Sequence, residues 1–399
     1  MATFADLKKC AEKIHDPRIN RTKLHNLAEM VVVAVYAVLC GACGWVDIEA
    51  TARARIQDLR MFIDLPNGIP SHDTFGRVFR RINPGELETA ISSWLSVQML
   101  SHKGETLAMD GKTLRRSIDA AAGLSALHSI SLYATDARMV LGQLFGYDKD
   151  SEIPQGVELL KMLDIPGAVV TIDAIGCQKK TVQQIVEGNK ADYVIACKKN
   201  QPGLSDFIED CFKDADVHGG RYSMSFHKTL DTGEHGRYDQ RSCTCIDVSA
   251  WGPGVFPGWT GLKTIARVTS IPDSQSGRAP ATRYFISSLP CDARDILGRT
   301  RGHWQIENGL HYVLDVTFRE DDSRIRKDNG PRNFAVFRRA ALALVRNNMA
   351  SAGDPRITSC RQAVRMAALN PAYAAALFTG GAIPVKGHGS SSDPWRAVE

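Results

Sequence analysis

Residues 168–174 have the sequence Ala-Val-Val-Thr-Ile-Asp-Ala, an apolar and β-branched run that ends at a carboxylate. Such a run is typical of a strand at the centre of a sheet, with both of its faces covered. Thr106–Asp110 and Asp192–Cys197 have the same character on either side of it. A helical pattern directly precedes the central run, and another separates it from the run that follows. The alternation predicts an α/β domain with a mixed sheet and helices on both faces.

Outward from that run, the chain predicts further strands and helices. His128–Ala134 and Met139–Tyr147 are apolar runs joined by Thr-Asp-Ala-Arg, which predicts a hairpin. Three helices are expected in the same region: Gly156–Leu163, Gln178–Glu187 and Pro202–Asp214. Residues 216–290 are rich in Ser, Thr, Gly and Pro and contain strand-like runs such as Gly261–Thr269 and Thr282–Ser287. We expect a β-rich insertion there, followed by a helix over Asp295–Leu314.

The first part of the chain has a different pattern, with no strand signal. Leu24–Leu39 predicts a buried helix, and Asp47–Phe62 and Glu86–Leu100 predict amphipathic ones. Ser71 is placed to cap another helix. The expected domains are therefore an all-helical one over 1–96, a catalytic one over 97–350, and a tail over 351–399 that is loose from Pro384 onward.

Composition places the chain among globular proteins. Of 399 residues, 44% are hydrophobic and 23% are charged, which excludes disordered and fibrous classes. Ten cysteines are too few for a disulfide scaffold. The longest apolar run, residues 30–42, is too short to span a bilayer. We expect a cytoplasmic protein without a membrane partner.

The positive charge is concentrated in one stretch. The net charge is +5, and residues 324–346 contain seven basic residues opposed only by Asp328. A basic stretch on a nearly neutral body is typical of a phosphate-binding face. The alternative is a solvated helix flank beside Val336, Ala340 and Leu344.

Three acidic residues lie where chemistry is expected. Asp110 and Asp173 end two of the predicted strands, and Glu307 lies in the late helix. In such sheets, functional sites commonly lie at the ends of the strands. Two Asp and a Glu from a covering helix can hold two Mg²⁺ about 3.5–4 Å apart for an in-line phosphoryl displacement. The alternative is that each Asp only caps a turn.

The stretches that contain these acids resemble a known family. They are Met109-Asp-Gly-Lys-Thr113, Thr171-Ile-Asp-Ala-Ile-Gly-Cys-Gln178 and Gly302-His-Trp-Gln-Ile-Glu307, which continues to Asp321. Together with residues 65–75 and 192–201, they resemble the DDE transposases of bacterial insertion sequences, in the group that includes the H-repeat-associated proteins. The resemblance covers roughly residues 8–350.

The resemblance implies an RNase H-like core in which Asp110, Asp173 and Glu307 bind two Mg²⁺ or Mn²⁺ ions. It implies cleavage at the element ends and attack of the 3′-hydroxyl on target DNA. Double-stranded DNA is the expected partner, as terminal inverted repeats and as target. The helical domain would help to bind the ends, and a homodimer or larger assembly would form on DNA at the nucleoid. The alternatives are a nuclease without strand transfer and an inactive copy that acts as a DNA-binding regulator.

One part of the family pattern is missing. Related transposases often place Tyr, Arg and Lys around the Glu, where this chain has Thr300, His303 and Leu314. We expect Arg301 and His303 to replace those DNA contacts, from their position on the helix. The other expected DNA contacts lie beside the acids or in the basic stretch: Lys112, Arg115, Lys179, Lys198, Lys199, Arg324, Arg326 and Lys327.

Two further interpretations stay open from the sequence. His303, Glu307 and His311 recur every four residues on one helix face, which is a spacing that can bind zinc. Soft ligands occur elsewhere, at Cys40, Cys43, Cys243 and Cys245. Trp304, beside the Glu, can stack on a base, although core packing is the better expectation.

Overall fold

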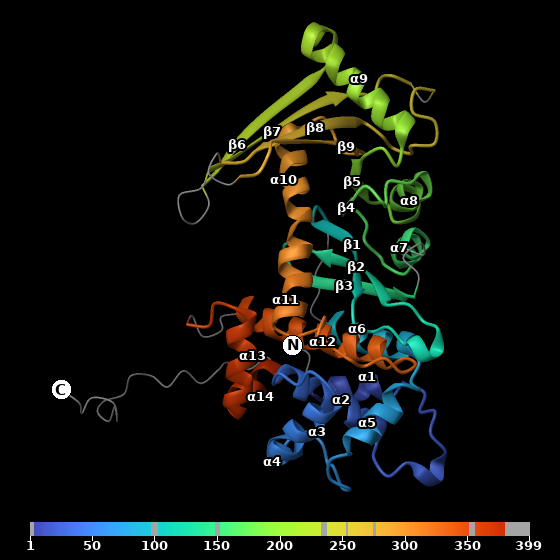
Figure 1. The fold of residues 1–399 in the computed structure, drawn as a ribbon, viewed down its shortest axis with the longest axis vertical. Coiled ribbons are helices and arrows are strands. Elements are labelled where there is room, and N and C mark those ends of the chain that lie inside the picture. The colour runs from blue at the N-terminus through green and yellow to red at the C-terminus, as the bar shows by residue number, and fades with distance from the viewer. Residues whose placement is uncertain are drawn as a thin grey trace, which may run out of the picture. The chain divides into compact units, whose positions relative to one another are not determined.

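The structure is a computed structural model that describes residues 4–96, 103–147, 152–232, 238–252, 254–273, 277–350 and 356–379 (Figure 1). The chain forms two compact units. One unit consists of Met1–Gln98 and Asp328–Glu399, and the other of Met99–Lys327. In the described residues, no helix is long and apolar enough to cross a membrane.

The unit Met99–Lys327 is built on one nine-stranded sheet. Its order is β3-β2-β1-β4-β5-β9-β8-β7-β6. The strands are β1 (Thr106–Leu114), β2 (Leu127–Ala134), β3 (Met139–Gly146), β4 (Val169–Ile172), β5 (Asp192–Cys197), β6 (Met224–Thr232), β7 (Tyr238–Asp247), β8 (Thr264–Ile271) and β9 (Ala281–Ser287). β1 is antiparallel to β2 and parallel to β4, and β4 is parallel to β5. This arrangement confirms the predicted RNase H-like mixed sheet.

The β-rich insertion is also confirmed, and it continues the same sheet. β9 pairs antiparallel with β5, and β8, β7 and β6 follow outward in antiparallel order. The sequence located strands in the second half of the insertion. It did not locate β6 and β7, whose half-polar sequences lack a continuous apolar run.

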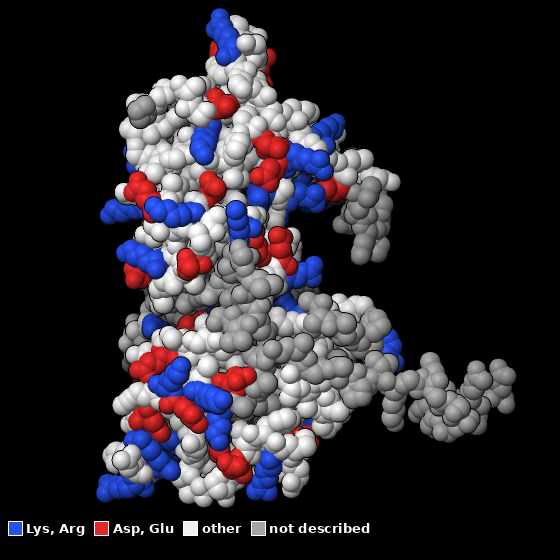
Figure 2. Space-filling view, turned by 180° about the vertical axis from the view of Figure 1, so that it is seen from behind, with Lys and Arg blue, Asp and Glu red and all other residues white. Residues whose placement is uncertain are grey.

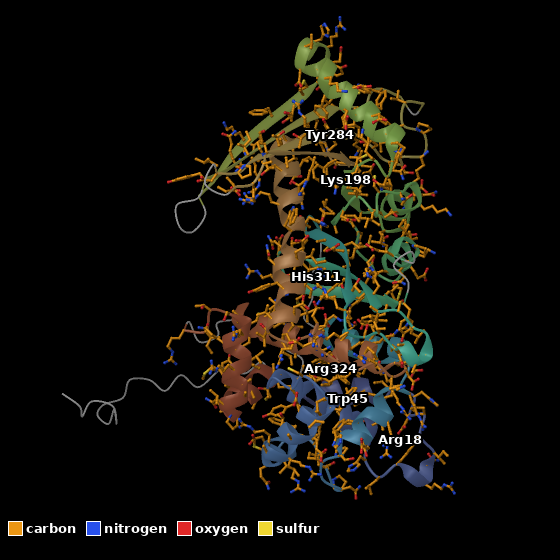
Figure 3. The ribbon with its side chains drawn as sticks, in the orientation of Figure 1. Arg18, Trp45, Lys198, Tyr284, His311 and Arg324 are labelled. Atoms are coloured by element: carbon orange, nitrogen blue, oxygen red, sulfur yellow. The ribbon has the colours of Figure 1, made fainter. Side chains whose placement is uncertain are left out.

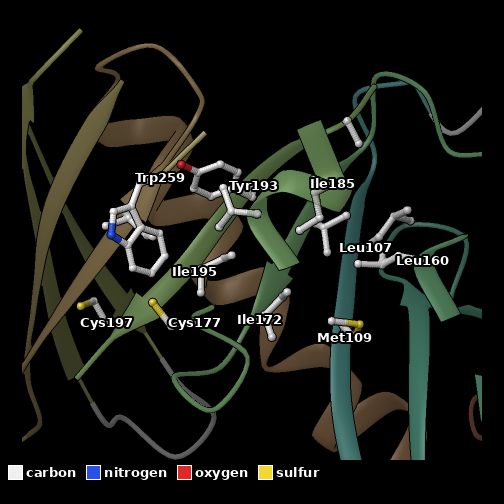
Figure 4. Close-up of a cluster of buried hydrophobic side chains, with 14 of the residues drawn as sticks. Leu107, Met109, Leu160, Ile172, Cys177, Ile185, Tyr193, Ile195, Cys197 and Trp259 are labelled. Atoms are coloured by element: carbon white, nitrogen blue, oxygen red, sulfur yellow. The ribbon is translucent and has the colours of Figure 1, made fainter. Parts of the chain in front are cut away.

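Helices cover both faces of this sheet, which explains why its central strands are apolar throughout. Val169 and Val194 pack against α10 (Ala293–His303) on one face. Val170 and Ile195 belong to a core on the other face, part of which is drawn in Figure 4. Figure 1 shows α9 lying across the insertion strands on the face opposite α10. The helices on the second face are α7 (Glu152–Lys161), α8 (Lys179–Gln183), a π-helical turn (Gln184–Gly188) and α9 (Pro202–His218).

The predicted helix over Asp295–Leu314 is present, but it is not uniform. After α10, the chain forms a π-helical segment, η8 (Ile306–His311), and then α11 (Tyr312–Val316). In η8 the N–H of Tyr312 donates to the carbonyl of Glu307, five residues back. Such π-helical segments are rare and occur frequently at functional sites.

The other unit is helical. Its helices are α1 (Phe4–Ala11), α2 (Leu27–Leu39), α3 (Trp45–Ala54), α4 (Ile56–Arg60), α5 (His72–Phe79), α6 (Pro84–Ser96), α12 (Gly330–Ala350), α13 (Cys360–Leu369) and α14 (Pro371–Thr379). Every residue of α2 is buried, and α12 packs against α2 and α6. Ser71 caps α5 by accepting from the N–H of Thr74 at 3.3 Å, as predicted. The stretch from Pro384 lies outside the described residues.

The fold divides the basic stretch 324–346. Arg338, Arg339 and Arg346 lie on α12 and are 1%, 8% and 8% exposed. The guanidinium of Arg338 lies 4.4 Å from the ring centroid of Phe334, and Arg339 pairs with Glu88 at 2.9 Å. The prediction of one phosphate-binding face over this stretch is therefore wrong for its helical part, because three of the four arginines there are buried within the helical unit. α12 also joins that unit, which differs from the expected domain boundary at residue 350.

Candidate active site

Asp110 lies inside β1 and not at its end. The parallel ladder with β4 stops at the pair Met109–Ile172. The antiparallel ladder with β2 continues to Leu114. The expected strand end at Asp110 is therefore wrong, because β2 keeps the following residues in the sheet. Asp110 is still the first residue beyond the pairing with β4.

Asp173 is the first residue after β4, as predicted. Its Oδ1 atom accepts a hydrogen bond from the N–H of Ile175 at 3.0 Å, which fixes the carboxylate in a tight turn. Because Met109 is paired with Ile172, the next residues along the two strands are Asp110 and Asp173. Adjacent strands are about 4.8 Å apart, so the two aspartates leave the parallel ladder side by side.

Glu307 is exposed and lies in η8, between two histidines that contact the sheet. His303 lies over β4, where its Nδ1 is 3.1 Å from Thr171 Oγ1. His311 lies over β1, where its Nδ1 is 3.6 Å from Asp110 Oδ2. Figure 3 shows His311 on the helical segment that passes these strands. The two contacts hold the helix across the strands that carry the aspartates, with Glu307 midway between them.

The three carboxylates share one electrostatic environment, which we call the acidic site. The pKa of Asp110 is raised to about 7, first by burial and then by the negative charges of Asp173 and Glu307. Glu152 adds a smaller repulsion, and the N–H of Gly111 partly offsets these effects. Like charges this close disfavour joint ionisation. A cation among them would remove the repulsion.

Both histidines beside the acidic site are neutral near pH 7. Burial lowers the pKa of His303. Burial and the nearby ammonium of Lys112 lower the pKa of His311 to about 4. His311 Nε2 is shielded from solvent and makes no hydrogen bond to any described residue.

Lys112 lies two residues beyond Asp110, and its side chain is 9% exposed. Its Nζ contacts a carboxylate oxygen of Asp315 and is 2.8 Å from Glu320 Oε2. Burial opposes the charge on Lys112, but Glu320 and Asp315 outweigh it and raise its pKa. We call these three residues the lysine cluster. It ties β1 to α11 and occupies the ammonium, so the phosphate contact predicted for Lys112 does not fit its environment.

Of the other expected DNA contacts, His303 is enclosed over β4 and bonded to Thr171. The remaining ones are on the surface. Several are paired: Arg115 with Asp321 at 3.5 Å, Lys199 with Glu209 at 3.3 Å, Arg301 with Asp231 at 2.8 Å, and Lys327 with Asp119 at 3.7 Å. Arg326 donates to the carbonyl of Arg116 at 3.1 Å, and Lys179, Lys198 and Arg324 are also exposed. The face in Figure 2 shows Lys and Arg interspersed with Asp and Glu. Their roles in DNA binding remain predictions.

Metal binding was tested on the donor atoms present. Among the described residues, no three His, Cys, Asp or Glu side chains are arranged closely enough to coordinate one ion. This finding applies equally to the acidic site and to the zinc alternative. Cys40 and Cys43 contact the carbonyls of Ala367 and Gly41. Cys243 and Cys245 contact each other within the sheet, with their sulfur atoms 3.6 Å apart.

The chemistry of the donor atoms in the acidic site, as distinct from their spacing in this structure, suits a hard divalent cation. The site offers carboxylate oxygens, which Mg²⁺ and Mn²⁺ prefer. Burial and the negative charges of Asp173 and Glu307 raise the pKa of Asp110, and Nε2 of His311 is buried without a hydrogen-bond partner among the described residues. Each of these features is relieved by a cation.

Sequence reasoning missed several residues of this region. Asp315 and Glu320 lie in the quoted stretch around Glu307, so the motif contained them, but their partner Lys112 lies far away, in β1. Glu152 and His128 form a buried pair at 3.1 Å on the other face of β1. A Cβ on Gly111 would lie 2.6 Å from His128 Nε2, which explains the glycine after Asp110.

Trp304 is 43% exposed, so the expectation of core packing is wrong. The guanidinium of Arg283 lies 4.9 Å from its ring centroid. This cation–π contact holds the ring at the surface, about one turn before Glu307.

Comparison with known proteins gives two matches to family models. Residues 9–95 match a DDE_Tnp_1-associated region, and residues 101–345 match a transposase DDE domain. The H repeat-associated putative transposase YhhI of Escherichia coli K12 is 32% identical over 382 residues, which are 94% of this chain and 99% of that protein. The putative transposase YncI of E. coli O157:H7 is 34% identical over 326 residues, 81% of this chain and 83% of that protein.

One solved structure also aligns with the chain. It is the cryo-EM structure of the piggyBac transposase synaptic complex with hairpin DNA. The alignment covers 94% of this chain and 78% of that one, at 11% identity and a TM-score of 0.43.

Proposed function

The chain belongs to the DDE transposase family of the bacterial insertion-sequence type, and from this premise we propose how its acidic site works. Asp110, Asp173 and Glu307 cleave DNA at the ends of an insertion sequence and join the released 3′-hydroxyl to target DNA. Both steps need Mg²⁺ or Mn²⁺, and both use the same site.

One observation carries the proposal. Burial raises the pKa of Asp110, and the negative charges of Asp173 and Glu307 raise it further, although the three residues come from β1, the end of β4 and η8. This repulsion supports the proposal that three separated parts of the chain supply carboxylates to one site. Isolated turn caps would not influence one another in this way.

The residues present have distinct tasks. The turn hydrogen bond from Ile175 fixes Asp173, and the two strand ladders fix Asp110. The hydrogen bond of His303 and the lysine cluster hold the helix that presents Glu307. A bound divalent cation would activate the attacking oxygen and stabilise the leaving one. The protein's part is to hold that cation and the phosphate in a fixed arrangement.

DNA binding is proposed for the exposed basic residues and for the helical region that accompanies the catalytic domain. Arg324, Arg326 and Lys198 are available to phosphates, since their side chains lie at the surface. Residues 9–95 match a region defined by its association with this transposase domain, which supports a role at the element ends. We expect at least a homodimer on DNA, because two ends must be joined together.

The test uses the full chain and DNA that carries the sequences flanking its reading frame. Cleavage at the element boundary and joining to a plasmid should occur with Mg²⁺ or Mn²⁺ and stop when EDTA is added. Cleavage without joining would indicate a nuclease. Binding of the ends without cleavage in either metal would indicate a regulator and would overturn the proposal.

A further inference from the structure

One arginine of the β-rich insertion has no role in the proposed function. Arg283 lies in β9, is exposed, and holds its guanidinium 4.9 Å from the ring centroid of Trp304. The guanidinium makes no hydrogen bond or ion pair within the described part of the chain. We infer that Arg283 binds a DNA phosphate beside the acidic site. This inference rests on the proposed function, since it takes DNA as the substrate.

The register of the sheet places Arg283 at the edge where Asp173 lies. Ile172 pairs with Ile195, and Ile195 pairs with Ile286. The level of Asp173 therefore continues across β5 to Phe285 of β9. Because β9 runs antiparallel to β5, Arg283 lies two residues beyond that level, past the carboxyl end of β4.

Arg283 and Asp173 also share one face of the sheet. Phe285 packs under α10, and side chains two residues apart in a strand point to the same face, so Arg283 lies on this face too. In β4, Val169 packs under α10 and Thr171 bonds His303. Asp173 continues that series. Figure 1 shows α10 passing from the insertion strands toward β1.

The ring under the guanidinium belongs to the helical segment that presents Glu307. Trp304 directly follows His303 and precedes Glu307 by three residues, about one helical turn. The cation–π contact restricts the guanidinium to the face of this ring. A planar guanidinium held in this way keeps its N–H edge for an anion, and phosphate accepts two parallel hydrogen bonds from such an edge.

A second arginine of the insertion has the same aromatic contact but a balanced charge. Arg267 lies 4.9 Å from the ring centroid of Phe212 and donates to both carboxylate oxygens of Asp216, at 2.7 and 2.8 Å. Its cross-strand partner is Tyr284, the residue after Arg283. Asp216 and Phe212 belong to α9, on the opposite face. Only Arg283 thus keeps its two-pronged donor edge for a ligand from outside the chain.

The distance to the acidic site indicates which phosphate is bound. β9 and β4 are separated by two strand spacings, about 10 Å. Arg283 therefore contacts a phosphate that flanks the cleaved one, and not the cleaved phosphate itself. The carboxylates of the acidic site repel the DNA backbone, and a guanidinium at this distance offsets that repulsion.

The first experiment measures the affinity of the full chain for DNA that carries an element end, in EDTA and at several salt concentrations. Arg283→Gln should weaken binding by about tenfold and reduce the slope of log K against log salt by about 0.9. Arg267→Gln is the matched control and should keep the wild-type slope. Arg283→Lys should restore the slope but not the full affinity, because lysine lacks the planar fork. A wild-type slope in Arg283→Gln would overturn the inference.

The second experiment locates the contact by replacing single phosphates near the cleavage site with neutral methylphosphonates. One replacement should weaken binding by the wild type and by Arg267→Gln, yet cost Arg283→Gln nothing further, because the interacting pair is already broken. If every replacement weakened Arg283→Gln as much as the wild type, Arg283 would contact none of these phosphates and the inference would fail.

Both measurements are made without metal, so their outcome is separate from that of the cleavage test. Wild-type protein that binds the ends but cleaves them in neither Mg²⁺ nor Mn²⁺ would overturn the proposed function, while the slope and the methylphosphonates would still decide the role of Arg283. Wild-type protein that binds no DNA would overturn both.

Discussion

Two groups of carboxylates lie beside β1, one around Asp110 and one around Lys112, and they are balanced in different ways. In the lysine cluster, Asp315 and Glu320 surround the buried ammonium of Lys112. In the acidic site, no lysine or arginine of the described residues pairs with Asp110, Asp173 or Glu307, and burial together with the charges of Asp173 and Glu307 raises the pKa of Asp110. The first group supplies its own cation and fixes the structure. The second requires a cation from solution, and we propose that it performs the chemistry.

The largest effect is expected from a substitution that disrupts the acidic site. Glu307→Gln should lower the rate of end cleavage by about 10²–10³-fold or more, because the cation proposed to stabilise the transition-state charge loses one of its carboxylates. Glu307 is exposed, so the thermal midpoint should barely change. Asp164→Asn is the matched control, since Asp164 is a carboxylate before β4 and outside the acidic site. Wild-type cleavage by the Glu307→Gln protein would exclude Glu307 from the site.

The second prediction concerns a substitution that disrupts the lysine cluster. Lys112→Met should destabilise the fold by about 3–5 kcal/mol, because it removes the ammonium that balances the charge of the buried Glu320. Urea unfolding followed by circular dichroism measures this change.

A triple variant distinguishes charge from packing in this cluster. Adding Asp315→Asn and Glu320→Gln to Lys112→Met should recover most of the lost stability, since no charge of the cluster then remains unpaired. If the triple variant were as unstable as Lys112→Met alone, the lysine would stabilise the fold through the packing of its side chain and not through its charge.

The third prediction concerns how the stability of the metal-free protein depends on pH through the carboxyl group of Asp110. The pKa of Asp110 is about 7 in the folded chain, against an ordinary value of 3.8. The folded state holds the extra proton between these values, so stability falls as pH rises from about 4 to 7 and stays lower above that. Asp110→Asn should therefore stabilise the metal-free protein at pH 8 by up to about 4 kcal/mol. At pH 4 the gain should vanish.

Unfolding in EDTA at the two pH values measures this gain. Saturating Mn²⁺ in place of EDTA should reverse the order of the two proteins, since the wild type gains binding energy that the variant lacks. A gain of equal size at pH 4 and pH 8 would show that the carboxylate charge is not the cause.

The smallest expected effect concerns the basic stretch. Replacing Arg324 and Arg326 by Gln should weaken DNA binding modestly. It should also reduce the slope of log K against log salt by about 0.9 for each phosphate that the variant no longer neutralises. Arg339→Gln is the control, because its guanidinium is buried against Glu88 and should change stability but not the slope. An unchanged slope in the double variant would indicate that these arginines face solvent without contacting phosphates.

The sequence predicted those features of the fold that are set by residues close to one another along the chain. The β-branched run before Asp173 predicted β4 and its terminal carboxylate, because burial on both faces leaves an apolar strand without polar positions. The order of strands and helices predicted the α/β core, and the Ser71 cap followed from the capping preference.

The features that failed depend on distant partners. β1 continues past Asp110 because β2 pairs with it, and no local signal marks the difference. Arg339 of the basic stretch is buried because Glu88, on a helix remote in the chain, receives its guanidinium. The π-helical turns of η8 follow no amphipathic period that the sequence reveals. Lys112 looked like a phosphate contact because Asp315 and Glu320 are also remote in the chain.

The most direct test of the central claim measures DNA binding and cleavage on one preparation of Asp173→Asn. The substitution keeps the volume and removes one charge from the acidic site. We predict that a gel shift finds the element ends bound as tightly as by the wild type, or more tightly, while cleavage falls by orders of magnitude. If Asp173 only capped its turn, binding and cleavage would fall together as the fold weakened. Cleavage at the wild-type rate would contradict the claim that this transposase works through three carboxylates.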